Sequence, residues 1–548
     1  KQEFILEPLL DIHLYSNLLQ ESQPEERGDG DSVYALSIIA FFILVIAWVN
    51  YINLATAKSF ERANEVGVRK VMGAQKNQLM NQFLSEAFLV NLLAAFISVV
   101  AVWLIWPFFA NLSGRNIPLA YLGQPDFWLL LGALFFVGTI LSGFYPALVL
   151  SSFKPVAVLK GKVMHTVHGN FLRKSLVVFQ FVASVVFISG SVIVYQQLKF
   201  MRSQDLGIDI KQTVVLKGPG VVVDSLFIQN LEGMKAEALR IPGIKSMTAS
   251  SNVPGDEIFW ASGIRRINGG PENSISGYTV GIDHDYVPAF DLNVVAGRNF
   301  DLDHPNEKKS VIINEAMSVA LNFENPKAAI GEKVRHGGDT IEIVGVLENY
   351  HQMSLKEVVT PLVYRYTPDF ASFFAFKVES DNYSQIVSSL QEPWETFFPG
   401  NPMDYFFLDQ FFNRQYDQDR KFSQIFALFT LLIIFVACLG LFGLASFMTL
   451  QRTKEIGIRK ALGSTSSEVI LLLSKGFVQL VLIANLIAWP LAWYLMDNWL
   501  QSFPYRININ PVLFVLAGLG VVVIAFLSVA WQTMKAAKVN PAITLKNE

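Results

Sequence analysis

Apolar residues along this chain gather into long uninterrupted runs instead of alternating with polar ones. A helix needs about twenty apolar residues to cross a bilayer core of roughly 30 Å. Runs of that kind lie at 34–57, 83–110, 127–150, 175–198, 422–449, 474–496 and 511–534. The pattern therefore predicts seven membrane spans surrounded by a lipid bilayer.

The stretch between the fourth and fifth spans, residues 199–421, has the composition of a folded water-exposed domain. Segments such as "QTVVLKG", "SVIINEAMSVAL" and "DTIEIVGVLENY" combine strand patterns with short helical ones. Turn signals at Pro242-Gly243 and Pro254-Gly255 separate them. We expect a large α+β domain here, and hence a multi-domain membrane protein built from an α-helical bundle and this domain.

The approach to the fifth span keeps a helical spacing of aromatic residues. The string "DYFFLDQFFNRQYDQDRKFSQIFALF", residues 404–429, contains no helix breaker. We predict one continuous helix that extends beyond the bilayer as a stalk.

Basic residues occupy alternate connections between the spans, as expected when Lys and Arg mark the cytoplasmic side. They follow the first, third and fifth spans and fill the tail: Lys58, Arg62, Arg69, Lys70 and Lys76; Lys154, Lys160, Lys162, Arg173 and Lys174; Arg452, Lys454, Arg459 and Lys460; Lys535, Lys538 and Lys546. The opposite connections, 111–126 and 497–510, hold one Arg each. The pattern predicts a cytoplasmic C-terminus and a large domain on the outer side.

The chain contains an internal repeat. "EVGVRKVMGA" at 65–74 aligns without gaps with "EIGIRKALGS" at 455–464, and "SSFKPVAVLKG" around Pro155 parallels "AKVNPAITLKN" around Pro541. Repeated membrane units indicate a pseudo-symmetric assembly. By that symmetry the first half lacks an opening span and most of an outer domain. We therefore expect an N-terminally truncated sequence from a full-length protein of eight spans.

The repeat selects candidate functional residues, because both halves keep the same residue types at the same spacing. These are Glu65, Gly67, Arg69, Lys70 and Gly73 in the first half, and Glu455, Gly457, Arg459, Lys460 and Gly463 in the second. We predict a short helix ending at each final glycine, since glycine tolerates the left-handed cap conformation. Apolar Val66, Val68, Val71 and Met72 would then face the membrane or a partner groove. Basic anchoring of a loop is the simpler interpretation, but duplication of the whole pattern favours docking of another protein.

Several chemistries are disfavoured. The net charge of −3 and the lack of a basic arm argue against nucleic-acid binding. The string nearest to a phosphate-binding loop, "GNFLRKS" from Gly169, lacks the second glycine, so we expect no ATPase activity and no bound cofactor in this chain. Asn50, Asn53 and Gln180 are the main polar residues deep in the spans, which disfavours an ion-coupled transporter.

No enzyme or metal site is evident. Cys438 is the only cysteine and lies in a span, so it can form neither an intrachain disulfide nor a cysteine metal site. His284, His304, His336 and His351 lack metal-ligand spacing, and no Ser, His and acid set indicates a hydrolase.

These residues resemble a known family, the FtsX-like, MacB-type permeases of ABC transporters in their double-length form. The similarity rests on the two E-[VI]-G-[VI]-R-K-x-[ML]-G loops, the Pro-x-x-x-Leu-Lys exits, "FLRKSLVVFQF" at 171–181, and "GRNFDLDHPNEKKSVIINEAMSVAL" followed by "IGEKVR" and "IVGVLENYH". The resemblance implies that the basic loops are coupling helices docking onto a separate ATPase, with two ATPase subunits that bind the ATP. It further implies a bacterial inner membrane, a periplasmic core domain that handles substrate outside the bilayer, and a place for a periplasmic adaptor and an outer-membrane channel.

The resemblance also divides the chain into expected units. Residues 1–33 end a first periplasmic domain and stalk, 34–160 form a first permease unit, 161–198 an amphipathic elbow and the fourth span, 199–421 the periplasmic core domain, and 422–548 a second permease unit. Three functions fit: export of a peptide, antibiotic or lipid-linked molecule, mechanical regulation of a cell-wall hydrolase or sensor kinase, and lipoprotein release.

Overall fold

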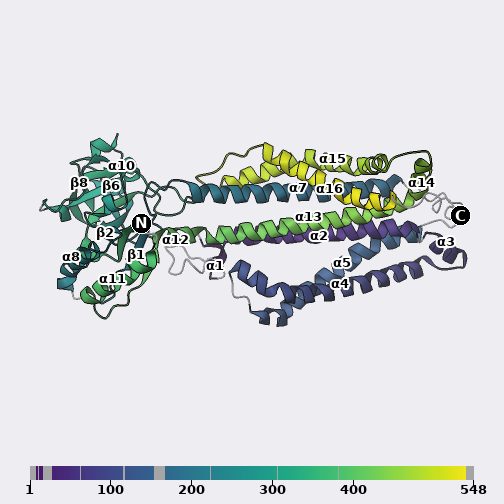
Figure 1. Ribbon diagram of the computed structural model, residues 1–548, viewed down its shortest axis with the longest axis horizontal. Coiled ribbons are helices and arrows are strands. Elements are labelled where there is room, and N and C mark those ends of the chain that lie inside the picture. The colour runs from purple at the N-terminus through teal and green to yellow at the C-terminus, as the bar shows by residue number, and fades with distance from the viewer. Residues whose placement is uncertain are drawn as a thin grey trace.

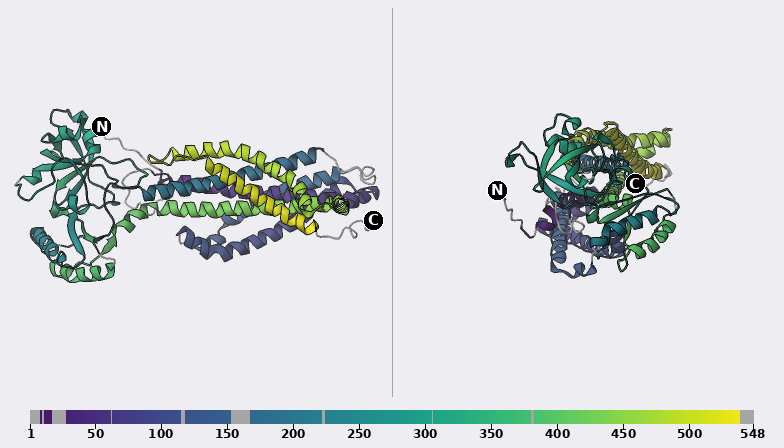
Figure 2. Two further views of the ribbon diagram at one scale, coloured as in Figure 1. Left: turned by 45° about the horizontal axis from the view of Figure 1, so that its top comes forward. Right: turned by 90° about the vertical axis from the view of Figure 1, so that its left-hand side faces the viewer.

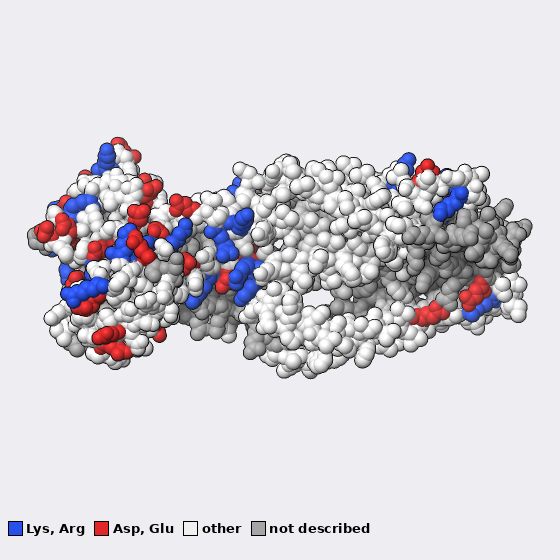
Figure 3. All heavy atoms as spheres, viewed as in Figure 1, with Lys and Arg blue, Asp and Glu red and all other residues white. Residues whose placement is uncertain are grey.

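The protein is elongated, with a helical bundle that carries a sheet-containing domain at one end (Figures 1 and 2). The computed structural model describes residues 8–9, 11–16, 28–61, 63–114, 118–152, 167–221, 224–304, 306–379 and 382–537. Charged side chains are spread over the sheet domain and a few lie near the far end of the bundle, whereas the face between them shows none (Figure 3). Large exposed side chains of this middle part, such as Phe96, Leu104 and Leu486, are apolar, and we call it the apolar band. This distribution is that of a bilayer-spanning protein, since water would not tolerate so broad an apolar surface.

The described residues contain seven helices that are long and apolar enough to cross a membrane, which confirms the predicted number. They are α2 (Gly30–Glu61), α4 (Lys76–Ser113), α5 (Pro125–Ser152), α7 (Val167–Ser203), α13 (Asp417–Gln451), α15 (Ser466–Leu500) and α16 (Val512–Ala537). Three shorter helices accompany them: α1 (Ile12–Tyr15), α3 (Ala63–Val71) and α14 (Thr453–Ala461).

Helix α13 is the centre of the bundle and contacts α2, α7 and α16. Asn50 of α2 donates to the carbonyl oxygen of Val436 at 2.7 Å, and Gln180 of α7 donates to that of Ala437 at 2.9 Å. Polar side chains in lipid often join helices in this way. These two polar residues of the spans thus hold α13 to its neighbours on both sides.

The two repeated halves differ in packing. Helix α15 packs against both α7 and α16, and 33% of its most apolar stretch is buried, whereas none of the most apolar stretch of α4, its counterpart in the first half, is buried. Among the described residues, no helix packs against α4 and α5 in the way that α7 packs against α15 and α16. The eighth span stays a prediction.

The sheet domain is the predicted domain of residues 199–421, and we call it the outer domain. It contains a layer with the order β-α-β-β-α-β. Its elements are β1 (Thr213–Lys217), α8 (Phe227–Ala238), β2 (Ile244–Ser250), β10 (Phe373–Val378), α11 (Tyr383–Phe397) and β11 (Tyr405–Phe407). The strands pair antiparallel in the order β11-β1-β10-β2. Alternate strand residues pack against the two helices in one core that includes Trp394 and Phe374.

A ring of six strands is inserted between β2 and β10. The inserted segment comprises β3 (Ala261–Arg266), β4 (Ile275–Ile282), α9 (Tyr286–Ala289), β5 (Val294–Gly297), β6 (Ser310–Asn314), α10 (Glu315–Ala320), β7 (Lys333–His336), β8 (Asp339–Leu347) and β9 (Leu362–Tyr366). The order β4-β3-β7-β8-β6-β9 closes through a parallel pairing of β9 with β4, and β5 extends it beside β8. The outer domain is α+β, as predicted.

The stalk exists, but it starts later than predicted. Residues 405–407 form β11 against β1, followed by α12 (Leu408–Asn413) and a 3-10 turn, η8 (Arg414–Tyr416), before α13 begins. The single helix from residue 404 is therefore wrong, because pairing with β1 outweighs the local helical spacing. With 35 residues in α13 and 37 in α7, each helix is about 50 Å long and exceeds the roughly 30 Å bilayer core.

Candidate functional site

The ten repeated residues lie on and directly after α3 and α14. Each of these short helices follows a spanning helix, α2 or α13, and both lie at the end of the bundle opposite the sheet domain (Figure 1). The two copies of the motif, far apart in the sequence, are thereby brought to one end of the molecule.

Each short helix turns one apolar residue inward. Val66 is buried with Leu79 and Phe83 of α4. Ile456, its counterpart, is buried with Val469 and Leu473 of α15. The expectation that Val66 faces the membrane or a partner is therefore wrong, because this side chain fixes α3 to the helix that follows it.

The opposite face of each helix is apolar and exposed. Met72 is 84% exposed and Leu462, its counterpart, 81%, while Val68 and Ile458 are about half exposed. Residues four apart lie on the same helix face. Val68 with Met72 and Ile458 with Leu462 thus form two matching apolar patches, which we call the end patches.

The predicted glycine caps are present and have the same geometry in both halves. Gly73 has φ +97° and Gly463 φ +95°. In each copy the glycine N–H and the next N–H bond back to the carbonyls of the Lys and Arg: Gly73 to Lys70 at 3.1 Å, Ala74 to Arg69 at 3.0 Å, Gly463 to Lys460 at 3.0 Å and Ser464 to Arg459 at 3.0 Å. This is the Schellman pattern, which ends a helix and turns the chain sharply.

The repeated acidic and basic residues pair within each helix. Arg69 lies 2.8 Å from Glu65, and Arg459 lies 3.0 Å from Glu455. All four side chains are more than 40% exposed, so each pair stabilises its helix by only about 0.3–0.5 kcal/mol. A contribution this small does not account for keeping both residues in both copies.

The two halves differ next to the arginines. Arg69 also donates to the side-chain carbonyl oxygen of Gln82 on α4 at 2.6 Å. The repeat places Leu472 where the first half has Gln82. Gly67 and Gly457 are buried in both copies, and Lys70 and Lys460 are half-buried.

A second set of contacts joins the outer domain to the stalk, and the sequence did not indicate it. Three consecutive residues of the loop after β8 bind the start of the stalk. The Ser354 N–H donates to Oε1 of Gln415 at 2.9 Å, the Leu355 N–H donates to the Tyr416 hydroxyl at 3.0 Å, and Lys356 lies 2.7 Å from Asp419. We call these contacts the stalk junction.

The connection between α15 and α16 also reaches the outer domain. Gln197 of α7 donates to the carbonyl oxygen of Tyr505 at 2.8 Å and accepts from the N–H of Ile507 at 3.0 Å. The Tyr505 ring meets the His351 ring edge-on, with 4.8 Å between centroids. The backbone N–H of His351 donates to the carbonyl oxygen of Leu206 at 2.9 Å. The outer domain therefore contacts α7, α13 and the connection between α15 and α16, all at the end of the bundle nearest to it.

Comparison with known proteins agrees with this geometry. The model of the FtsX-like permease C-terminal region matches residues 37–155 and 427–541, one copy on each repeated unit. The model of the MacB-like periplasmic core domain matches 178–393, which contains most of the outer domain. The chain belongs to the FtsX/MacB-type permeases.

Individual relatives of the permease match over short stretches. The macrolide export ATP-binding/permease protein MacB of Shewanella sp. (strain ANA-3) is 33% identical over 89 residues, which are 16% of this chain and 14% of that protein. The protein of the same name from Psychrobacter cryohalolentis is 28% identical over 127 residues, 23% of this chain and 18% of that one. The alignments thus span less than a fifth of these relatives' length.

Two solved structures resemble part of the permease. The periplasmic region of MacB from Actinobacillus actinomycetemcomitans is 15% identical and aligns with a TM-score of 0.28, over 38% of this chain and 94% of that one. The extracellular domain of the noncanonic ABC-type transporter YknZ from Gram-positive bacteria is 21% identical with a TM-score of 0.25, over 35% of this chain and 97% of that one.

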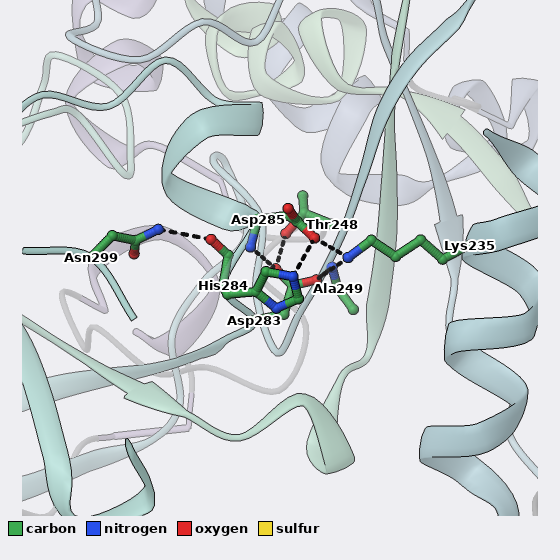
Figure 4. A network of polar contacts seen from close by, with 7 residues as sticks. All are labelled: Lys235, Thr248, Ala249, Asp283, His284, Asp285 and Asn299. Carbon is green, nitrogen blue, oxygen red and sulfur yellow. Dashed lines mark hydrogen bonds and ion pairs between the residues drawn. The ribbon is translucent and has the colours of Figure 1, made fainter. Parts of the chain in front are cut away.

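A network of polar contacts fixes α8 of the permease to its sheet (Figure 4). Lys235 of α8 forms ion pairs with Asp283 and Asp285, which follow β4. Asp283 also accepts from the Thr248 hydroxyl at 2.5 Å and from the Ala249 N–H at 3.0 Å. Burial raises the pKa of Asp283, while these donors and Lys235 oppose that shift. Because both carboxylate oxygens of Asp283 have partners, Asp283 and Lys235 act as a structural anchor.

The described histidines form no metal site. In the part of the permease that the structure describes, no three His, Cys, Asp or Glu side chains gather as metal ligands would. His336 lies 2.6 Å from the Ser262 hydroxyl, and burial lowers the pKa of His336 to about 4. The exits at Pro155 and Pro541, with Leu159-Lys160 and Leu545-Lys546, fall outside the described residues.

Proposed function

We propose that this permease is the transmembrane subunit of an ABC transporter and that α3 and α14 each dock one subunit of a separate ATPase. The observation that carries the proposal is the pair of end patches, which two matching helices with matching glycine caps present at the same end of the bundle. Met72 and Leu462 are too exposed to contribute to the fold, so their contact surface is available to a partner.

The duplicated surface is the basis for proposing two ATPase subunits. A repeated docking helix suits a symmetric dimer, because each ATPase subunit would meet the same apolar patch beside the same Glu–Arg pair. The chain itself has no phosphate-binding loop in its sequence. ATP would therefore be bound and hydrolysed by the partner.

Movement at α14 has a direct route to the outer domain. Helix α13 ends at Gln451, α14 begins at Thr453, and the other end of α13 meets the stalk junction. A displacement of α14 would thus move a helix that contacts the outer domain about 50 Å away. The substrate would be handled on the outer side of a bacterial inner membrane, with the C-terminus in the cytoplasm and no passage of substrate among the apolar spans.

Export of a peptide, antibiotic or lipid-linked molecule is the favoured task. The relatives that match are named macrolide export proteins, which supports export over mechanical regulation of a hydrolase or kinase and over lipoprotein release. A periplasmic adaptor and an outer-membrane channel would be further partners in such an assembly.

Co-purification with the cognate ATPase tests the docking proposal. The Arg69→Glu plus Arg459→Glu variant should lose ATPase binding, because it reverses the charge beside both end patches. It also places two carboxylates four residues apart in each helix, which weakens the helix. The control is Arg240→Glu plus Lys245→Glu, which reverses two exposed charges of the outer domain away from both short helices, and it should bind as the wild type does. If the reversed variant still binds the ATPase and supports normal ATP turnover, the docking proposal fails.

A further inference from the structure

A small positively charged cavity opens where the stalk meets the outer domain. Its volume is about 240 Å³, and Arg202 at the end of α7 lines it together with Arg414 of η8 and Arg420 in the first turn of α13. Gln410 and Asn413 of α12 also line it. Three arginines from α7, η8 and α13 thus line one cavity, and we call this the arginine pocket.

Two of the three arginines of the pocket have no carboxylate partner among the described residues. Asp417 is the one acidic residue in the lining, and it lies 3.2 Å from Arg420. Among the described residues, Arg202 and Arg414 have no carboxylate within ion-pair distance, and Arg414 lies over the Phe411 ring at 5.8 Å. The lining therefore carries a net positive charge with free N–H donors, which suits an anion.

The pocket lies at the edge of the apolar band. Arg420 and Lys421 directly precede Phe422, where the apolar part of α13 begins, and Arg202 follows Leu198 by four residues, or about 6 Å of helix. The Lys421 side chain lies against Gly114, the residue that ends α4. Figure 3 shows basic side chains gathered at this border beside the sheet domain. The headgroups of a bilayer extend roughly 5–8 Å beyond its hydrocarbon core, so the pocket is at headgroup depth.

Apolar surface suited to acyl chains continues below the pocket. Tyr195 of α7 is 60% exposed and Leu431 of α13 is 62% exposed, each two to three turns nearer the bilayer centre. Arginines on the side of the outer domain are not needed to orient the protein in the membrane, since Lys and Arg set orientation from the cytoplasmic side. A ligand that explains the arginines should therefore have an anionic head and an apolar tail.

We infer that the arginine pocket binds the phosphate of an anionic lipid headgroup in the leaflet that faces the outer domain. Arginine binds phosphate through paired N–H donors, and the amides of Gln410 and Asn413 can bond the remaining headgroup oxygens. The cavity is smaller than the roughly 300–1,000 Å³ of sites that enclose drug-sized molecules, so it fits a headgroup and not a bulky antibiotic. Because Arg202 belongs to α7 and Arg420 to α13, a bound phosphate bridges the two stalk helices beside the stalk junction.

Binding of short-chain lipids to the purified full chain tests the inference without an ATPase, so its outcome is independent of the docking proposal. Native mass spectrometry in neutral detergent would compare dioctanoyl phosphatidylglycerol, dioctanoyl phosphatidylcholine and inorganic phosphate. The pocket variant is Arg202→Gln plus Arg414→Gln. The control, Lys199→Gln plus Lys421→Gln, removes the same charge at the same depth from residues that do not line the pocket.

We expect phosphatidylglycerol to bind the wild type and the control equally, and the pocket variant about tenfold more weakly or worse. Phosphatidylcholine should bind less well, and inorganic phosphate should not displace the lipid at equal concentration. Equal loss in both variants, or loss in neither, would overturn the pocket as the site. Equal binding of phosphatidylcholine would overturn the anionic headgroup, and efficient displacement by inorganic phosphate would overturn a lipid as the source of the phosphate. The thermal unfolding of both variants should match the wild type, because Lys199, Arg202 and Arg414 are exposed and Lys421 is only partly buried.

Discussion

The side chain of Gln197 donates a 2.8 Å hydrogen bond to the backbone carbonyl of Tyr505, 308 residues further along the chain. The same amide accepts from the Ile507 N–H at 3.0 Å. Gln197 is fully buried near the outer end of α7. Its amide satisfies a backbone carbonyl and a backbone N–H of the 501–510 connection, which in a strand or helix would bond to other backbone groups. This residue ties the outer ends of α15 and α16 to the stalk and, through Tyr505 and His351, to the outer domain.

Replacing Gln197 with Leu should release the 501–510 connection. The substitution leaves a partly buried N–H and a partly buried carbonyl without their partner, at a cost of about 1 kcal/mol or more. Hydrogen exchange measured on the full chain should show the Ile507 amide exchanging about tenfold faster or more. The neighbouring Gln196→Leu variant is the control and should exchange as the wild type does. Unchanged protection of Ile507 in Gln197→Leu would show that the bond does not hold the connection.

The glycine caps should be needed for docking. Gly73→Ala and Gly463→Ala force a side chain into a positive-φ conformation, which costs about 1 kcal/mol or more at each position. A methyl group would meet no atom within 4 Å at either site, so the penalty is conformational and not steric. We expect weaker co-purification of the ATPase and faster hydrogen exchange over 65–73 and 455–463.

Gly476→Ala is the matched control for the caps, because it also adds a methyl group in open space but lies inside α15 with ordinary helical φ. The double variant Gly73→Asn plus Gly463→Asn should bind the ATPase better than the double Ala variant, since Asn adopts left-handed conformations more readily than Ala. Full ATPase binding by the double Ala variant would contradict a role for the caps.

Asp256 should make the outer domain less stable at neutral pH than in mild acid. Burial raises the pKa of Asp256 to about 6 from an ordinary 3.8, against the hydrogen bond from Asn252. The folded state therefore holds the proton more tightly than the unfolded state. The contribution of this group to stability is full below about pH 4 and is lost as the pH rises through about 6.

Asp256→Asn should raise the unfolding free energy of the outer domain by about 1–2 kcal/mol at pH 7.5, with the difference vanishing near pH 4. Thermal unfolding of the full chain at several pH values measures it. His336 makes stability rise with pH over the same range, because its pKa is lowered to about 4. This contribution is the same in the variant and the wild type, so it cancels when the two are compared at each pH. A difference that grows toward acid pH would contradict the assignment.

Gly440 of α13 is expected to be sensitive to any added side chain. A methyl group there would overlap the Asn50 amide, which also donates to Val436. Gly440→Ala should destabilise the bundle by about 1–3 kcal/mol, and adding Asn50→Ala should recover part of that loss. Thermal unfolding in detergent measures both, with Gly132→Ala in α5, where a methyl group meets nothing within 4 Å, as the control. Additive effects of the two substitutions would contradict the contact.

Features with a local sequence signal could be predicted. The seven spans follow from apolar runs whose length the bilayer sets, and the caps at Gly73 and Gly463 follow from comparing the repeats. The orientation of Val66 could not be predicted, because a helix of nine residues gains its buried face from α4. The strand at 405–407 was predicted as helix since its partner β1 lies nearly two hundred residues earlier.

The stalk junction had no signal in the sequence at all. Ser354 and Gln415 are 61 residues apart, as are Leu355 and Tyr416, and each bond uses a backbone N–H that any residue except proline could supply. The β-α-β-β-α-β layer was equally hidden, because the strand ring separates its second and third strands by residues 251–372. Only the folded chain brings these segments together.

Photo-crosslinking at the end patches tests the docking claim most directly. A photo-reactive phenylalanine analogue would replace Met72 or Leu462, and, as controls, Leu104 of α4 or Leu486 of α15, which are similarly exposed within the apolar band. In the complex with the cognate ATPase, crosslinks to the ATPase should form at 72 and 462 and not at 104 or 486. An intact complex that gives no ATPase crosslink at either 72 or 462 would contradict docking through α3 and α14.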